Sequence, residues 1–495
     1  MVVAATLPAL VAAIPLGYLV LRLSQSDPER LIASLWRART LELAANSLGL
    51  SVTVAVGCLL IGVPTAWAIT RLKLPAPALW RALATLPLAI PSYVAAFAWV
   101  ATWPGISGFW PTAAILTLAC APYVTLPVAA ALTMADSRYA DAARTLGANP
   151  ARVLLRVTLP RIAPAAAAGA LLAALYTLAD FGAVSLLRYP TLTWGVHAAF
   201  EGSLDRVLAA ALSAVLVALA FVFVAGEQLM RRRAARAVAA TGAEPTLATA
   251  GARTRAAAIA GLVVTAALSI GIPLGALVIR LTLGVDRDLE WPRLAESTAS
   301  TLGLGLAGAA IAVLLALPIA TLAARYRSFV GGILESFAYL GHVVPGVVVG
   351  LSLVFFTLAV APALYQTVFA LVFAYGVLFL PKALGSSRSA IRNVPPALED
   401  AARTLGLGRL ATWWRVTARI AIPGIAAGGL LAAVTAMKEL PATLMLRPIG
   451  IETLATELWQ KTAIAAYGAA TPYAIALVIV ASIPAFFLAR SGDRP

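Results

Sequence analysis

The chain of 495 residues has little charge: 12% of its residues are Asp, Glu, Lys or Arg, and its mean hydropathy is +0.91. A soluble globular protein carries about 25% charged residues, so the composition excludes that class. Cysteine is also scarce. The two cysteines, Cys58 and Cys120, fall in separate apolar runs, which excludes a disulfide framework and a CxxC metal site. We expect both to be packing residues.

Several motifs of enzymes are also missing. The sequence has no GxxxxGK[ST] phosphate loop, so we expect no ATP binding of the P-loop kind, and it has neither an HExxH zinc motif nor a GxSxG elbow. The polar segments are too short to fold an enzyme domain. We therefore predict no catalytic residue and no bound cofactor. The two histidines, His197 and His342, show no Cys or carboxylate neighbour at metal-ligand spacing, so no metal site is predicted.

Long apolar runs are what the sequence has in abundance. Runs of about 17 to 25 residues, enough to cross a bilayer, recur along the whole chain and predict an all-α polytopic membrane protein. We predict about twelve spans, near 1–21, 46–70, 84–103, 111–133, 165–187, 207–226, 259–281, 297–323, 334–360, 363–381, 424–446 and 467–489. The first run lacks a positively charged start and is long enough to span, which favours a retained helix over a cleaved signal peptide.

Basic residues predict the orientation. The chain has 37 Lys and Arg against 21 Asp and Glu, a net charge of +16. If the N-terminus is cytoplasmic and twelve spans follow, most of these basic residues fall in cytoplasmic segments, as the positive-inside rule requires. We therefore expect both termini in the cytoplasm. Basic inner loops explain a pI near 10.5 without nucleic acid, so no nucleic-acid partner is expected.

The heptapeptide DAARTLG marks an internal duplication. It occurs at 141–147 and again at 400–406, 259 positions later, and the same offset matches Arg188 with Arg447. With six spans in each repeat, both copies emerge on the same face, so the repeats are parallel and not inverted. The predicted organisation is a first repeat at 1–226, a cytoplasmic linker at 227–258 and a second repeat at 259–495.

Each heptapeptide lies in a longer polar loop, at 135–164 and at 382–423. Residues 135–146 are good helix formers, and Gly147 stands where a C-cap glycine ends a helix before a second short helix begins. Since the flanking spans have diverged, two matched loops indicate docking surfaces for a common partner and not a relic of duplication. The predicted docking residues are Asp141, Ala142, Ala143, Gly147, Asp400, Ala401, Ala402 and Gly406.

The segment DAARTLGANPARVLLRVTLP (141–160) resembles the EAA loop of ATP-binding-cassette (ABC) importer permeases. Both have an acid, two alanines, a glycine six residues after the acid, an aliphatic residue ten positions on, and then Leu-Pro. The second copy has Ala418-Arg419 in place of Leu-Pro, so we expect its docking helix to end differently. The resemblance implies the fold of a type I ABC importer permease, with coupling helices that seat in ATPase subunits.

The resemblance also implies partners and a place in the cell. Two EAA loops in one chain resemble a fused permease that serves two ABC ATPase subunits, which use the ATP, on the cytoplasmic face. An extracytoplasmic substrate-binding protein would deliver the cargo, and the chain would lie in the bacterial inner membrane. The segments 177–187 and 437–455 look like those of ferric-iron importer permeases, although thiamine, polyamine, sulfate and phosphonate permeases share the scaffold. A secondary transporter driven by an ion gradient is the alternative of a different class.

Charged residues in or near the spans are candidates for function. Asp180, Lys438 and Glu439 fall within apolar runs, where a charge costs about 2.5 to 3.5 kcal/mol, and the repeats place Asp180 opposite Glu439. They either face the translocation pathway or pair to hold the two halves together. Arg188 and Arg447 follow at equivalent outer ends, where they either contact the binding protein or extend to the membrane interface.

Overall fold

The computed structural model describes residues 2–134, 142–143, 145–202, 205–238, 251–283, 290–326 and 329–492. Within these ranges the regular structure is helical, without a strand, which confirms the predicted all-α class. Nine of the described helices are long and apolar enough to cross a membrane, or ten if the pair Pro77–Ala89 and Ser92–Thr102, bent by 90°, is one span. Shorter apolar helices cover the two remaining predicted spans, 334–360 and 467–489.

The chain forms two compact units, and we describe each by itself. The first-repeat unit comprises residues 35–195 and 215–285. Its helices are α3 (Ala38–Arg71), α4 (Pro77–Thr85), η1 (Leu86–Ala89), α5 (Ser92–Thr102), α6 (Phe109–Met134), α8 (Pro150–Val153), η2 (Leu154–Thr158), α9 (Leu159–Ala179), α10 (Gly182–Leu186), α13 (Ala252–Ala266), η4 (Ala267–Gly271) and α14 (Ile272–Leu283).

The second-repeat unit comprises residues 1–34, 196–214 and 286–495. Its helices are α1 (Val2–Ser24), η3 (Ala198–Gly202), α15 (Trp291–Arg325), α16 (Phe329–Ala338), α17 (Leu340–Val343), α18 (Gly346–Val360), η5 (Pro362–Leu364), α19 (Val368–Arg392), α20 (Pro396–Thr404), α21 (Arg409–Thr412), η6 (Trp413–Ala418), α22 (Arg419–Met437), α23 (Pro441–Leu446), α24 (Leu454–Ala463) and α25 (Tyr467–Gly492). Three helices have residues in both units: α2 (Pro28–Leu35), α11 (Leu192–His197) and α12 (Arg206–Val238).

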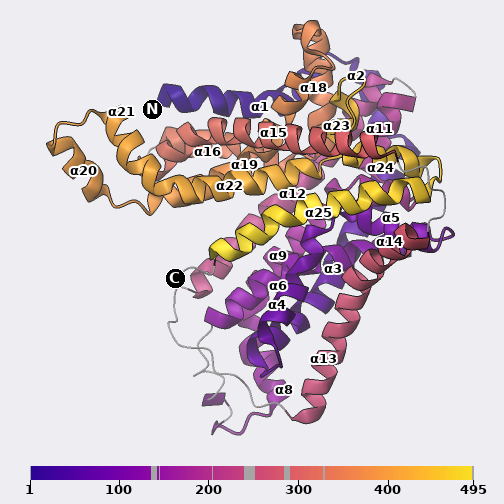
Figure 1. Ribbon diagram of the computed structural model, residues 1–495, viewed down its shortest axis with the longest axis vertical. Helices are drawn as coiled ribbons and strands as arrows, with labels where there is room; N and C mark the ends of the chain where they lie inside the picture. The colour runs from indigo at the N-terminus through magenta and orange to yellow at the C-terminus, as the bar shows by residue number, and fades with distance from the viewer. Residues whose placement is uncertain are drawn as a thin grey trace. The chain divides into compact units, whose positions relative to one another are not determined.

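Each unit contains the span that begins the other half of the sequence. Helix α1 packs against α15, α16 and α18 of the second-repeat unit, and Figure 1 shows it running beside α15 and α16. Helices α13 and α14, which open the second half of the chain, pack against α3, α4 and α5 of the first-repeat unit. The compact units therefore combine segments of both predicted repeats. The boundaries of those repeats, at 226 and 259, stay predictions.

Glycines allow α9 and α22, the spans that follow the two loops, to pack closely against neighbouring helices. A Cβ on Gly169 of α9 would lie 2.5 Å from the backbone oxygen of Tyr123 on α6, and one on Gly428 of α22 would lie 2.8 Å from Cβ of Ser386 on α19. These distances are too short for a side chain, so the helix backbones approach closely only because glycine stands there. The contact recurs at the same position of both repeats.

Candidate functional site: two matched loops and two buried acids

The two heptapeptides end their helices through the same hydrogen bonds. In each copy the leucine N–H donates to the carbonyl of the first alanine, and the N–H after the glycine donates to that of the second. The bonds are Leu146 to Ala142 (3.1 Å), Ala148 to Ala143 (3.0 Å), Leu405 to Ala401 (3.1 Å) and Leu407 to Ala402 (3.1 Å). The second bond of each pair spans five residues, as in a Schellman motif. Both loops thus share one backbone geometry.

Glycine is required in both turns by the backbone conformation. The φ angle is +81° at Gly147 and +87° at Gly406, in the region that L side chains rarely adopt. No atom lies within 4 Å of the position that a Cβ would take at either residue, so space does not exclude a larger side chain. The C-cap role predicted for Gly147 from the sequence is confirmed, and Gly406 repeats it.

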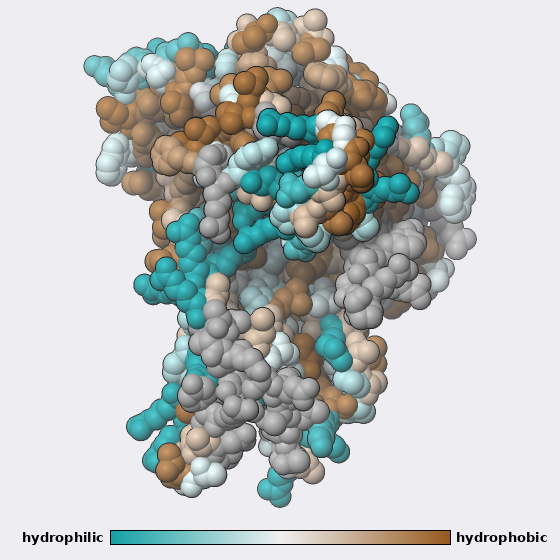
Figure 2. Space-filling view, turned by 90° about the vertical axis from the view of Figure 1, so that its left-hand side faces the viewer, coloured by the Kyte–Doolittle hydropathy of each residue, from teal (hydrophilic) through white to brown (hydrophobic). Residues whose placement is uncertain are grey.

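A leucine projects from each turn, directly before the glycine. Leu146 is 88% exposed and Leu405 is 85% exposed, so neither apolar side chain is covered by the rest of the chain. Figure 2 looks onto the side of the molecule on which α20 and α21 lie in Figure 1, where hydrophilic and hydrophobic surfaces meet. Sequence reasoning missed both leucines, although their repetition within DAARTLG was the signal that identifies them.

The predicted docking residues divide into outward and inward groups. Asp400 is exposed, with 70% of its side chain accessible, and Ala401 is exposed beside it. Ala402, by contrast, is buried at 7%, on a helix that packs against η6, so its small side chain serves packing within the chain. In the first copy Ala142 is exposed and Ala143 is half-buried. Asp141 lies outside the described residues.

Both loops enter their spans through a π-helical turn. The first, η2, covers Leu154–Thr158, and the second, η6, covers Trp413–Ala418, so the two begin at matched positions and differ in length by one residue. The replacement of Leu-Pro by Ala418-Arg419 thus coincides with one extra residue of π-helix before α22. Such turns interrupt an α-helix mostly at functional places.

Asp180 caps a short helix in the first-repeat unit. Its Oδ1 accepts hydrogen bonds from the N–H groups of Ala183 (2.9 Å) and Val184 (3.4 Å) in the first turn of α10. Its Oδ2 accepts the hydroxyl of Ser92, the first residue of α5. The residue is only 8% exposed, so the carboxylate is satisfied by the N-terminal ends of two broken helices.

Glu439 has the same role in the second-repeat unit. Its Oε1 accepts the N–H of Ala442 (3.0 Å), and its Oε2 accepts the N–H (2.9 Å) and the hydroxyl (2.8 Å) of Thr443 in α23. The hydroxyl of Tyr375 on α19 lies 2.6 Å from that of Thr443. Lys438, the preceding residue, is half-buried. Sequence reasoning found both acids and the broken helices beside them but missed their capping role.

The two arginines at equivalent positions have different surroundings. Arg447 forms an ion pair with Glu452, whose other oxygen accepts the hydroxyl of Thr456 (2.7 Å). Arg188 is exposed, and its φ of +53° places a non-glycine residue in the left-handed region, which costs about 1 to 3 kcal/mol. The two arginines therefore differ in their surroundings: Arg447 is held in an ion pair, whereas Arg188 is exposed.

The histidine prediction needs one correction. His197 Nε2 lies 3.4 Å from Oε2 of Glu201, one helical turn later, so the expectation that it has no carboxylate neighbour is wrong. Burial lowers the pKa of His197, and the charge of Glu201 opposes that shift. No group of three or more His, Cys, Asp or Glu residues with the arrangement of a metal site occurs among the described residues. The side chain of His342 is not among the described ones.

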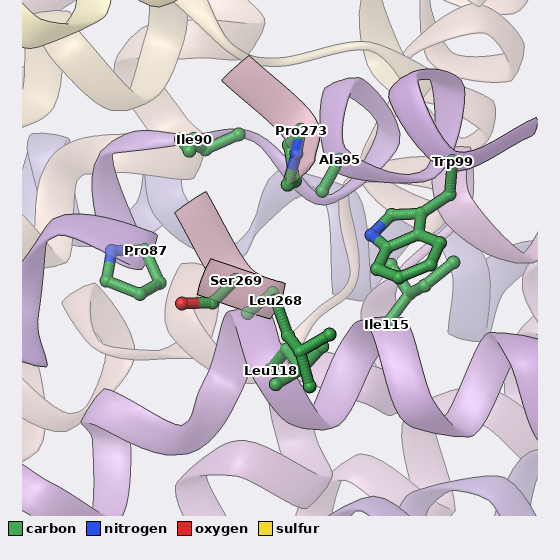
Figure 3. Close-up of a pocket in the computed structure, with 10 residues that line it drawn as sticks. Pro87, Ile90, Ala95, Trp99, Ile115, Leu118, Leu268, Ser269 and Pro273 are labelled. Carbon is green, nitrogen blue, oxygen red and sulfur yellow. The ribbon is translucent and has the colours of Figure 1, made fainter. Parts of the chain in front are cut away.

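A cavity in the first-repeat unit lies apart from both loops. Its volume between η1, α5, α6 and η4 is about 10 Å³, roughly the space of one water-sized sphere, whereas ligand pockets have about 300 to 1,000 Å³. Figure 3 shows its lining, which is apolar apart from Ser269. Cys58 and Cys120, also in this unit, are buried, form no disulfide and do not line the cavity. With no charged group in its lining, the cavity offers nothing that would hold a metal ion.

Comparison with known proteins identifies the repeated architecture. The family model described as "Binding-protein-dependent transport system inner membrane component" matches the chain twice, at residues 58–236 and 316–494. The chain belongs to this family. It is therefore a multi-pass inner-membrane permease of an ABC importer, a translocation subunit built from two repeats, as its resemblance to the EAA permeases implied.

Individual relatives agree with the family. The chain is 33% identical, over 96% of its own length and 95% of the relative's, to the Fe(3+)-transport system permease protein FbpB 2 of Haemophilus influenzae. It is 27% identical to the molybdate/tungstate permease WtpB of Thermococcus kodakarensis, over 36% of this chain and 72% of the relative. It is 32% identical to the sulfate permease CysT of Escherichia coli, over 25% of this chain and 50% of the relative. The match to FbpB 2 covers nearly the full length of both chains.

Proposed function

We propose that this permease imports ferric iron, delivered by an extracytoplasmic binding protein and driven by two ABC ATPase subunits. The observation that supports iron is the relative named for Fe(3+) transport, which matches 96% of the chain with both repeats. The relatives named for molybdate, tungstate or sulfate match no more than 39% of it. Iron is cargo in this proposal, so its affinity resides in the binding protein and the permease needs no resident metal site.

The two loops are the proposed ATPase docking sites. Support comes from their shared turn geometry, with left-handed glycines at Gly147 and Gly406, and from the leucines that project beside them. An exposed apolar side chain on a rigid turn is the kind of anchor that fills a groove in a partner protein. Asp400, together with Asp141 of the first copy, would form the polar rim. Each ATPase subunit would then receive one loop.

The proposed orientation places both termini and both loops in the cytoplasm. The basic cluster Arg231-Arg232-Arg233 near the end of α12 supports this, because such clusters stay on the cytoplasmic side. In the cycle, a loaded binding protein docks outside, ATP closes the ATPase pair, and the loops carry that closure to the spans so that the pathway opens outward. ATP hydrolysis resets it inward. The chain itself binds no cofactor and catalyses no reaction.

Uptake of labelled ferric iron into proteoliposomes tests the proposal. The vesicles contain the permease with its two ATPase subunits, and the loaded binding protein is added outside. We expect uptake that requires ATP inside and is not supported by a proton or sodium gradient alone. Uptake driven by a gradient without ATP would replace the proposal with a secondary transporter. ATP-driven uptake of sulfate, molybdate, thiamine, a polyamine or a phosphonate, without iron uptake, would keep the importer and reject the cargo.

A further inference from the structure

The last turn of α15 is bound to the second loop by a buried arginine. Nη2 of Arg325 lies 2.6 Å from Oε1 of Glu399 on α20, and the two side chains are 14% and 12% exposed. Nη1 of the same guanidinium donates a hydrogen bond to the backbone oxygen of Val394 (3.1 Å), just before α20 begins. One side chain of a membrane span therefore holds both the docking helix and the residues that lead into it.

Two further hydrogen bonds extend this connection to the start of the next span. Thr417 in η6 donates its hydroxyl to Oε1 of Glu399 (2.7 Å). Trp413, also in η6, donates its indole N–H to the hydroxyl of Thr321 on α15 (3.2 Å). We call this set the α15 clasp: Thr321, Arg325, Glu399, Trp413 and Thr417. It joins the end of one span to α20 and to η6, at the start of the next span.

The first repeat lacks the chemistry of the clasp at three of its five positions. Arg71 and Thr158 match Arg325 and Thr417, but the other three counterparts cannot reproduce its bonds. They are Ala140 for Glu399, Leu154 for Trp413, and Trp67 for Thr321. Alanine and leucine side chains neither carry a charge nor form hydrogen bonds.

The end of α3, which corresponds to the end of α15, makes contacts with α6 and α13. Nη2 of Arg71 donates to the backbone oxygen of Leu132 on α6 (2.7 Å). Trp67 packs against an apolar cluster of α3, its following residues and α13, made of Ala68, Leu72, Leu74 and Leu262. Trp67 thus joins the end of α3 to the span that follows the linker through apolar contacts.

We propose that the α15 clasp makes the second loop and α15 move as one body, so that closure of the ATPases at the second loop is passed directly to α15. The proposal rests on the docking function proposed above. A largely buried ion pair suits this role because separating the loop from the span takes the partner from the desolvated charge of Arg325, whereas Glu399 keeps Arg403 at 3.8 Å. Arg325 and Glu399 are positioning residues, since their side chains are only 14% and 12% exposed, whereas Leu405 is 85% exposed.

Substitutions that put first-repeat residues into the second repeat test the proposal. Glu399→Ala and Trp413→Leu each remove one connection of the clasp and leave Leu405 and Asp400 in place. The complete transporter is assembled with each variant, and ATP hydrolysis and iron uptake are measured in the same vesicles. We expect ATP hydrolysis to persist, while the iron imported per ATP falls by about fivefold or more, the lower end of usual coupling energies. A merely structural role would lower the amount of complex without changing this ratio.

The matched controls use the same pair of residues. The double variant Arg325→Met/Glu399→Gln is expected to lower the ratio by less than the sum of the two single changes, because both single changes remove the same ion pair. The exchange Arg325→Glu/Glu399→Arg is expected to restore part of it. If Glu399→Ala fails to assemble, Trp413→Leu decides, since it leaves the ion pair intact.

The outcomes separate this inference from the proposed function. A wild-type ratio in assembled Glu399→Ala and Trp413→Leu complexes, beside a wild type that imports iron, overturns the clasp alone. A wild-type complex that hydrolyses ATP without importing iron rejects the proposed cargo. The ratio is then measured with whichever cargo the wild type imports.

Discussion

Ser92 and Asp180, 88 positions apart, share a buried hydrogen bond that joins the first turns of two broken helices. At the equivalent positions of the second repeat stand Gly346 and Glu439, and a Cβ on Gly346 would lie 2.8 Å from Oε1 of Glu439. The shorter acid faces a serine and the longer acid faces a glycine. The extra methylene group of Glu439, compared with Asp180, thus occupies the space that a side chain at Gly346 would fill. The two repeats keep the same junction with different residues.

This exchange predicts that Gly346→Ser destabilises the permease. The added Cβ would force the carboxylate of Glu439 off the N-terminus of α23, at a cost of about 1 to 3 kcal/mol for an overpacked site. Combining it with Glu439→Asp recreates the pair of the first repeat and should restore most of the loss. Thermal unfolding of the purified chain in detergent measures both variants. A double variant no more stable than Gly346→Ser would show that the two residues do not compensate one another.

A second prediction separates capping from a charge in the pathway. Asp180→Asn keeps an oxygen that accepts the N–H groups of Ala183 and Val184, so we expect near-normal iron uptake. Asp180→Ala removes the cap, which costs about 0.5 to 2 kcal/mol, and should reduce the amount of assembled complex. The same comparison applies to Glu439→Gln and Glu439→Ala. Assembled Asn and Gln variants that fail to import iron would instead place the two negative charges on the translocation route.

Sequence reasoning succeeded where a local pattern carries the information. Apolar runs of membrane length locate the spans, because a bilayer admits few other segments, and letter-for-letter repetition locates both loops. The i, i+4 spacing of His197 and Glu201 was also readable, since such residues share a helix face, and it was missed.

Other features depend on contacts between distant segments. The sequence places Asp180 and Glu439 in apolar runs, and their capping partners lie only three and four residues further on, so the caps were readable and were missed. The bond of Asp180 to Ser92, 88 positions away, was not readable. The ion pair between Arg325 and Glu399 spans 74 positions and follows no spacing rule. The exchange of first spans between the units is likewise invisible, because the apolar residues of α1 and α13 are not confined to one helix face and so do not indicate which unit each helix joins.

The exposed leucines predict how each loop contributes to docking. Leu405→Asp places a charge where an apolar groove is expected, so binding of the ATPase should weaken by about tenfold or more, the effect of losing a central anchor. Leu146→Asp should do the same at the other loop, and Leu→Met at either position should change little. Titration of the reconstituted permease with ATPase subunits measures the affinity. Wild-type affinity in the double Asp variant would remove both leucines from the interface.

The turn glycines predict a graded effect of substitution at Gly406. Its φ of +87° disfavours valine strongly, whereas asparagine tolerates the left-handed region better, and neither meets a steric obstacle within the chain. We therefore expect Gly406→Val to shift Leu405 and uncouple ATP hydrolysis from iron uptake, and Gly406→Asn to retain much of the coupling. Gly147 should respond in the same order. Because both substitutions add a side chain, equal losses in the Val and Asn variants would mean that the added volume obstructs the partner. The ratio of iron imported to ATP hydrolysed, measured for all four variants, distinguishes backbone strain from obstruction.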